Sequence, residues 1–294
     1  MTSTRRSFLL GSVGAALVAF GSRSSSSRAF DDALQLQGTE DEFRRYAPLQ
    51  TRELELRDYH IHIRGGMTPE LAYKRTLATG VRSGVLENVG REWPLHSNEL
   101  LDAFILDVEK FNATLPVAER LKIGIQVNDR DWHTAIDPKI LKRLDYVLAD
   151  TMIMGKRPDG SDERLWLLPK DYDVDQDEWF ERYFQHCMTV VSEPIDILAN
   201  VTWLPDFIAP RYDELWTEER MRALIQKAVD GGKALEIQAE SAFPKPQFVK
   251  LALEMDAKFS FGSNNFDAKL KNADAWKRNI ELFKLTKENL WRDR

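Results

Sequence analysis

The feature that most constrains the fold of this chain is a regular alternation of short strand-like runs with longer helix-like segments. Strands that alternate with helices along a chain form parallel βαβ units. Seven such units, with no internal repeat and no linker to divide them, predict a single α/β domain, a distorted TIM-like (β/α)7 barrel. The predicted strands are residues 54–63, 82–88, 121–127, 145–149, 194–199, 234–238 and 258–261.

Capping residues indicate where several of the helices begin. Thr68 precedes Pro69, and Ser97 precedes another apolar-periodic segment, so both are expected to be N-caps. Two polar excursions, 153–176 and 203–216, interrupt the alternation after the fourth and fifth strands. The predicted helices are 69–80, 97–114, a short one from 137, 177–192, 217–229, 245–255 and 272–288.

The pattern of the N-terminal residues predicts a targeting segment. Residues 4–10 (TRRSFLL) resemble the twin-arginine export motif, and an uncharged Gly/Ala-rich run follows over 11–21. That run is short for a membrane span but has the length of a signal-peptide core. A Ser-rich stretch then leads to a small-residue cleavage site near Ala29. An uncleaved amphipathic anchor and a chance arginine pair are the alternatives.

These signals predict three regions: a twin-arginine signal peptide at 1–29, an N-terminal arm at 30–53 and a single barrel domain at 54–294. The expected partner in transport is the twin-arginine export machinery, and the mature protein is expected in the periplasm or outside the cell, with no stable membrane anchor after cleavage. The net charge is −6 and no basic block follows the signal, which argues against a nucleic-acid partner. The single Cys187 excludes an intramolecular disulfide.

The run Asp58-Tyr59-His60-Ile61-His62 ends the first predicted strand. Side chains at i and i+2 of a strand point to the same face. In a β/α barrel, residues at the carboxyl ends of the strands form the mouth where active sites are built. Two imidazoles at the mouth are half of a site for zinc, iron or a similar ion.

Four further strand ends, together with His-X-His, resemble the polymerase-and-histidinol-phosphatase (PHP) family of β7α7 barrels. The matching runs are DYVLA at 145–149, IDILAN at 195–200, ALEI at 234–237 and FGSNN at 261–265. The similarity spans residues 56 to about 268, in order. It implies a barrel that holds two or three metal ions and hydrolyses phosphate esters.

The family's metal ligands carry over incompletely. His60 and His62 match, whereas most other ligand positions carry amides or apolar side chains. Two or three divalent ions need several carboxylates to balance their charge, so the usual multinuclear centre is not predicted. The other family ligands fall near Asn88 and Val89, on Gln126, near Met152, and on Asn200, Asn264 and Phe266.

A site for one divalent metal ion (Zn, Mn or Fe) is predicted instead. Its ligands would be His60 and His62, with Asp150 or Glu236 as a carboxylate and Gln126 or Asn264 as a neutral oxygen ligand. The alternative is a metal-free mouth in which the histidines hydrogen-bond to these groups.

The predicted catalytic residues are Asp150, Glu236 and Glu87, one of which would accept a proton from metal-bound water. Basic, aromatic and amide side chains at the loop ends are predicted to bind the substrate. Arg64 leads this set because Gly65-Gly66 permit close backbone approach to a ligand. The predicted substrate-binding residues are Arg64, Arg130, Trp132, Asn200 and Asn265.

These residues predict an exported, metal-dependent hydrolase of the PHP type that acts on a small polar anion, phosphorylated or carboxylated. Two other classes of protein stay open. One is a metal-free acid–base enzyme on the same barrel, a sugar isomerase or lyase. The other is a non-catalytic protein that binds a carbohydrate or an anion.

Overall fold

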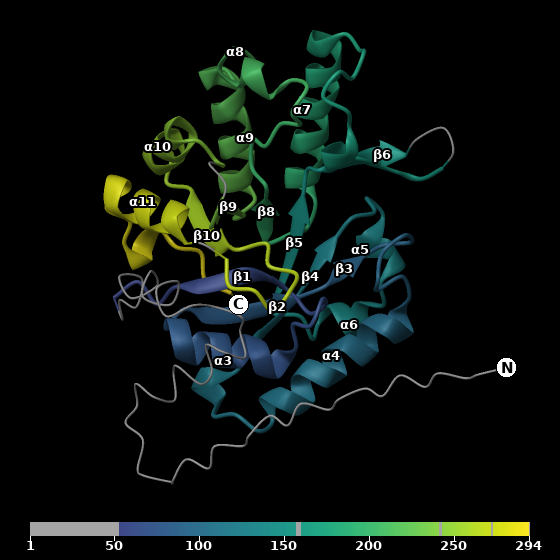
Figure 1. Ribbon diagram of the computed structural model, residues 1–294, viewed down its shortest axis with the longest axis vertical. Helices are drawn as coiled ribbons and strands as arrows, with labels where there is room; N and C mark the ends of the chain where they lie inside the picture. The colour runs from purple at the N-terminus through teal and green to yellow at the C-terminus, as the bar shows by residue number, and fades with distance from the viewer. Residues whose placement is uncertain (1–52, 157–159, 241–242, 272, 294) are drawn as a thin grey trace, which may run out of the picture.

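The structure is a computed structural model that describes residues 53–156, 160–240, 243–271 and 273–293 (Figure 1). The predicted signal peptide and all but the last residue of the predicted arm lie outside the described residues, so both stay predictions. Within the described ranges, no helix is long and apolar enough to cross a membrane.

Seven parallel strands close into a barrel, which confirms the predicted (β/α)7 fold. The strand order is β2-β1-β10-β9-β8-β5-β4, and pairing of β2 with β4 closes the ring, while the short β3 continues β2 along β4. The barrel strands are β1 (Arg57–His62), β2 (Arg82–Leu86), β3 (Asn88–Val89), β4 (Lys122–Val127), β5 (Tyr146–Asp150), β8 (Ile197–Ala199), β9 (Ala234–Gln238) and β10 (Lys258–Gly262).

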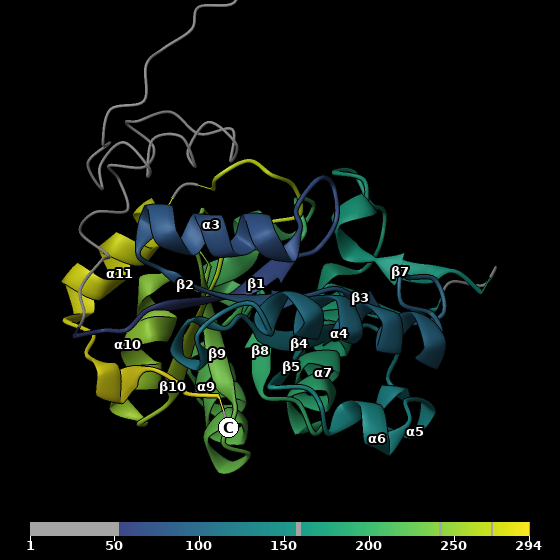
Figure 2. The same ribbon diagram turned by 90° about the horizontal axis from the view of Figure 1, so that it is seen from below.

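Helices lie around the outside of the strands, as Figures 1 and 2 show. Both predicted caps are confirmed: Thr68 Oγ1 accepts from the Leu71 amide and Ser97 Oγ from the Leu100 amide. The helices are α3 (Pro69–Thr79), α4 (Asn98–Asn112), α5 (Trp132–Ala135), α6 (Pro138–Leu141), α7 (Gln176–Ser192), α8 (Tyr212–Leu215), α9 (Glu218–Asp230), α10 (Pro246–Glu254) and α11 (Asp274–Phe283).

The two polar excursions carry secondary structure of their own. The first holds an antiparallel hairpin, β6 (Ile153–Lys156) with β7 (Asp162–Arg164), which projects from the barrel in Figure 1. The second holds a 3-10 turn, Ala209–Arg211, and then α8. The sequence pattern missed the hairpin because its strands are short and polar.

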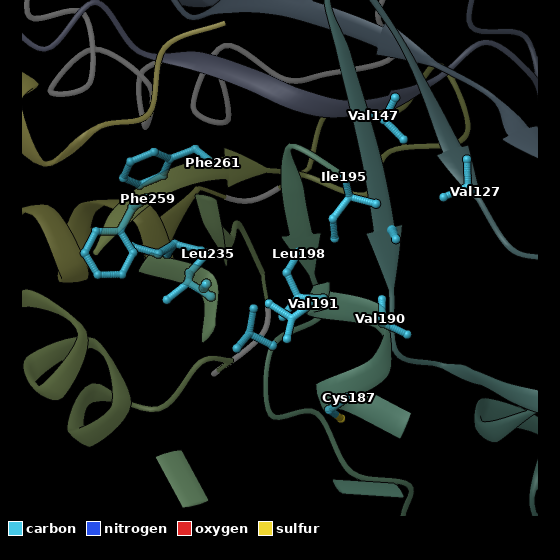
Figure 3. Close-up of a cluster of buried hydrophobic side chains, with 14 of the residues drawn as sticks. Val127, Val147, Cys187, Val190, Val191, Ile195, Leu198, Leu235, Phe259 and Phe261 are labelled. Atoms are coloured by element: carbon cyan, nitrogen blue, oxygen red, sulfur yellow. The ribbon is translucent and has the colours of Figure 1, made fainter. Parts of the chain in front are cut away.

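The outer face of the barrel forms the main core with the helices. Figure 3 shows this packing, in which Val147 and Leu198 of the strands and Cys187, Val190 and Val191 of α7 belong to one cluster. Cys187 is a buried free thiol within that cluster. Burial of apolar surface here stabilises the ring of helices on the barrel.

A second, smaller cluster contains alternate residues of the strands, such as Tyr146 and Leu148 on β5. Gly124 gives the Tyr146 ring its space, because a Cβ there would lie only 2.6 Å from the ring carbon Cε1. The C-terminal segment joins this cluster through Trp291, which packs edge-on against Tyr59. Most of this cluster lies in the first half of the strands, although Leu86 and Ala199 end β2 and β8.

Candidate functional site

A β-bulge in β1 sets the orientation of the histidines. Asp58 pairs with Ser83 and Ile61 with Val85, so β1 advances three residues while β2 advances two. Asp58 is turned toward α3, where its Oδ2 lies 2.6 Å from Arg75 Nη1. Asp58 Oδ1 accepts from the backbone amides of His60 (3.0 Å) and Ser263 (2.9 Å), which ties β1 to the end of β10.

His60 is completely buried and both of its ring nitrogens face hydrogen-bond acceptors. Nδ1 lies 2.6 Å from Glu236 Oε1, and Nε2 lies 3.0 Å from Gln126 Oε1. The Gln126 amide nitrogen donates to Asp150 Oδ2 at 2.6 Å, which leaves the Gln126 oxygen for His60. Both nitrogens thus face oxygen atoms that accept in this arrangement, which favours the doubly protonated, positively charged form of the ring.

The electrostatics agree with this protonation state. Burial alone favours the neutral ring, but the carboxylates of Glu236, Asp150 and Asp58 outweigh it and raise the pKa of His60 above its usual 6.5. Burial also raises the pKa of Asp150, although a hydrogen bond from the Met152 amide to its carboxylate opposes the rise.

The surroundings of His62 favour the neutral ring, in contrast to those of His60. Its Nδ1 lies 3.4 Å from Glu87 Oε1, so Nδ1 carries the proton and Nε2 holds the lone pair. Burial is the main cause that lowers the pKa of His62 to about 4, and the positive charge of His60 adds to the effect. The two ring centroids are 5.2 Å apart, so a charged imidazolium and a neutral imidazole stand side by side.

Gly262 of β10 provides the space for the pair of Glu236 and His60. A Cβ at this position would overlap Glu236 Oε1 and would lie 2.8 Å from His60 Cβ. The second oxygen of Glu236, Oε2, accepts from the backbone amide of Asn200 at 3.1 Å. Both carboxylate oxygens of Glu236 are therefore engaged, and its role in this arrangement is to hold His60.

The structure brings most of the predicted site residues together. Asn200 Nδ2 lies 3.4 Å from Asp150 Oδ2, and its side-chain oxygen accepts from Gln238. Arg64 Nη1 lies 3.4 Å from Glu87 Oε1, with the Arg64 side chain 36% exposed. The assembled residues are His60, His62, Arg64, Glu87, Gln126, Asp150, Asn200 and Glu236.

Other predicted residues are engaged elsewhere. Arg130 Nη1 and Trp132 Nε1 both donate to Glu193 after α7, at 3.1 and 2.8 Å, rather than to the histidine pair. Asn265 pairs with β1 through its backbone, and its side chain donates to the Lys269 carbonyl at 3.0 Å. Asn264 adopts a positive φ of 50° in the turn after β10. Their roles in substrate or metal binding stay predictions.

Gly65 has a different role from the expected one. Its φ is 59°, and a Cβ there would overlap the Phe266 carbonyl oxygen. The glycine thus lets the loop after β1 pass the loop after β10, which is an approach of backbone to backbone. Arg64 is positioned by the same crossing, with its guanidinium 5.9 Å from the centre of the Phe266 ring.

Sequence reasoning missed two residues that support the site, Arg75 and Gly262. It also missed the structural role of Asp58. A buried arginine in the middle of an otherwise ordinary helix carries no local signal. Gly262 did carry one, because a glycine inside a strand often marks close approach of another group.

The predicted one-ion site can be compared with these donors. Among the described residues, no group of three His, Cys, Asp or Glu side chains is arranged to hold a metal ion. His60 offers no lone pair while it donates from both nitrogens, and Gln126 contributes only a neutral oxygen. The residues as arranged do not fit the single-ion site, which stays a prediction.

No family model matches the chain, and no curated protein gives a significant match. The class that the fold and site define is a (β/α)7 barrel with a buried histidine pair, His60 and His62, whose hydrogen-bond partners differ. The resemblance to the PHP family rests on the sequence motifs alone.

Proposed function

We propose that the protein is an acid–base enzyme that moves protons on a small polar anion, an isomerase or lyase, without a resident metal ion. The observation that carries the proposal is the His60–His62 pair, whose hydrogen-bond partners give one ring a positive charge and leave the other neutral. Paired groups whose environments separate their pKa values are a recurrent basis for assigning a catalytic acid and base.

In this proposal, His62 Nε2 accepts a proton from the substrate. The positive charge of His60, held in place by Glu236, stabilises the negative charge that develops on the substrate. Arg64, at the partly exposed edge of the site, binds the anionic group of the substrate. The two histidine side chains are buried, and low exposure to water strengthens electrostatic interactions with them.

Solvent deuterium exchange tests the proposal. The protein would be treated with EDTA and incubated in D2O with a panel of sugar phosphates and sugar acids, and loss of a carbon-bound proton would be followed by 1H NMR. We expect exchange that survives chelation and falls by at least about 100-fold in His62→Gln. Exchange that disappears with the metal would reject the metal-free reading.

The metal-dependent hydrolase is the second candidate. It is favoured by one observation: a carboxylate that receives the Nδ1 proton of a histidine, as Glu236 does from His60, is the usual outer partner of a metal-binding histidine. Elemental analysis of protein purified without chelator separates the two candidates. About one equivalent of metal, lost in a His60→Ala, His62→Ala double variant, would select the hydrolase.

Cellular location belongs to the same proposal. Export by the twin-arginine machinery would deliver the folded barrel to the periplasm or beyond, where the substrate would have to be found. Export is compatible with both candidates, since it depends only on the first 29 residues.

A further inference from the structure

Two buried oxygen atoms beside the histidine pair have no hydrogen-bond partner among the described residues. They are Oε2 of Glu87 and Oδ1 of Asn88, and the two residues are only 3% and 2% exposed. A buried acceptor without a donor is destabilising, because it has lost its hydrogen bonds to water and gained none in return. Two such acceptors in adjacent residues therefore point to a ligand that supplies donors.

The strand register places the Asn88 side chain inside the barrel. Asn88 of β3 pairs with Gln126 of β4 in a parallel ladder, and paired residues present their side chains to the same face. The Gln126 side chain reaches His60 and Asp150, so this face is the interior. The Asn88 amide nitrogen lies 3.4 Å from Asn128 Oδ1, which turns its oxygen away from Asn128.

Glu87 lies where β2 gives way to β3 and reaches the end of β1. Its Oε1 accepts from the backbone amide of Asn88 at 2.7 Å. The same oxygen lies 3.4 Å from both His62 Nδ1 and Arg64 Nη1. Oε1 is thus used by the protein, whereas Oε2 is the oxygen left for another donor. The partly exposed guanidinium of Arg64 stands beside the same carboxylate.

We infer that the ligand of this site is a polyhydroxy anion, a sugar acid or a sugar phosphate, whose hydroxyl groups donate to Glu87 Oε2 and Asn88 Oδ1 while Arg64 binds its anionic group. The inference deepens the proposed function, and it rests on that function only in taking the barrel mouth as the ligand site. Hydroxyl groups supply donors without adding charge, and they also accept hydrogen bonds, so they suit a mouth that contains both acceptors and cations.

Calorimetric titration tests the inference with two matched pairs of probes. D-gluconate is compared with hexanoate, and D-glucose 6-phosphate with inorganic phosphate, because each pair shares a carboxylate or a phosphate and only one member carries alcohol hydroxyl groups. We expect at least one polyhydroxy anion to bind the wild-type protein about tenfold or more tighter than its partner. No preference in either pair would overturn the inference.

Two variants locate the preference. Asn88→Leu removes the Asn88 Oδ1 acceptor inside the barrel. It should reduce the preference for the polyhydroxy anion over its partner about tenfold. Asn128→Ala is the matched control: it removes the neighbour of the Asn88 amide but keeps the Asn88 oxygen, and it should retain the preference. Circular dichroism and thermal melting show that each variant is folded. An Asn88→Leu protein that is folded and keeps the full preference would contradict the assignment.

The two proposals fail separately. Preferential binding without any deuterium exchange would sink the proposed acid–base activity and leave the ligand class intact. Exchange on substrates regardless of their hydroxyl groups would do the reverse.

Discussion

The charge of an imidazole is decided by the atoms that face its two nitrogens, and His60 and His62 illustrate both outcomes two residues apart. His60 meets Glu236 and Gln126 oxygens and becomes a double donor. His62 meets a single carboxylate oxygen of Glu87 and keeps a lone pair. This difference, more than the identity of the residues, gives the site its proposed chemistry.

The protonation states predict a bell-shaped pH dependence of kcat/KM. Activity should rise as pH passes about 4, where His62 loses its proton, and should fall as pH rises through the pKa of His60, above 6.5. Nitrogen-15 NMR of histidine-labelled protein measures both states directly at a pH between 4 and 6.5. Signals of a neutral ring at His60 would contradict the assignment.

The same shifts affect stability with definite signs. The pKa of His60 is raised in the folded state, so its contribution is complete below 6.5 and is lost as pH rises through the folded pKa. The pKa of His62 is lowered, so its neutral burial costs stability as pH falls from 6.5 toward 4. Urea unfolding of wild type and His62→Gln should therefore diverge below pH 6.5, with the wild type losing more stability. Parallel curves would count against a neutral His62.

Gly262→Ala tests the packing of the Glu236 carboxylate against His60. The new methyl group would overlap Glu236 Oε1 and crowd His60, so we expect the pair to separate and activity to fall by at least about 100-fold. Gly232→Ala is a useful control, because a Cβ there meets no atom within 4 Å, although its positive φ of 64° adds backbone strain. Full activity in Gly262→Ala would show that Glu236 is free to adopt another position.

At the scale of elements, the bulge in β1 and the ion pair beneath it connect three parts of the barrel. Asp58 holds the His60 backbone, the Ser263 backbone at the end of β10 and Arg75 of α3. The helix therefore supports the site from outside the barrel, through a buried charge pair.

Arg75→Met should be strongly destabilising, by about 3–5 kcal/mol, because it leaves the Asp58 carboxylate buried without its counter-charge. Chemical denaturation measures the loss. The double variant Asp58→Asn, Arg75→Met should recover part of it, since the remaining partner is neutral. A single variant as stable as wild type would mean that Asp58 is solvated in another way.

For the whole molecule, the C-terminal segment closes the amino ends of the strands. The Tyr59 hydroxyl donates to Asp293 Oδ1 at 2.9 Å, and Lys122 pairs with the other oxygen of Asp293. Trp291 packs against Tyr59 and its amide donates to the Phe259 carbonyl at 2.8 Å. The first and last strands of the barrel along the chain, β1 and β10, pair with each other here, and this pairing is called the seam.

Truncation after Leu290 should lower the free energy of unfolding by about 1–3 kcal/mol, less than the removal of a fully buried aromatic costs, because Trp291 is only partly buried. Thermal melting and denaturant titration measure this effect. Trp291→Phe, which keeps an apolar ring, serves as the control and should lose less. An unchanged melting temperature after truncation would show that the seam closes without the tail.

Local sequence patterns were sufficient for the fold. Alternating apolar runs, N-caps and turn residues act within a few positions of one another, so they identified seven strands, the helices between them and the two histidines at a strand end. They also placed Glu236, Gln126 and Asp150 near strand ends. The hairpin β6–β7 and the bulge in β1 were missed, because neither has a strong local signature.

The chemistry of the site was decided by contacts that no local pattern contains. Glu236 is 176 residues from His60 in sequence, and Gln126 is 66 residues away, yet these two side chains set its charge. The sequence alone identified many of the polar groups at the strand ends, although Arg130 and Trp132, predicted for the same site, bind Glu193 instead. Only the closed sheet decided which oxygen faces which nitrogen, because hydrogen-bond roles and burial depend on strand register and on neighbours from β4 and β9.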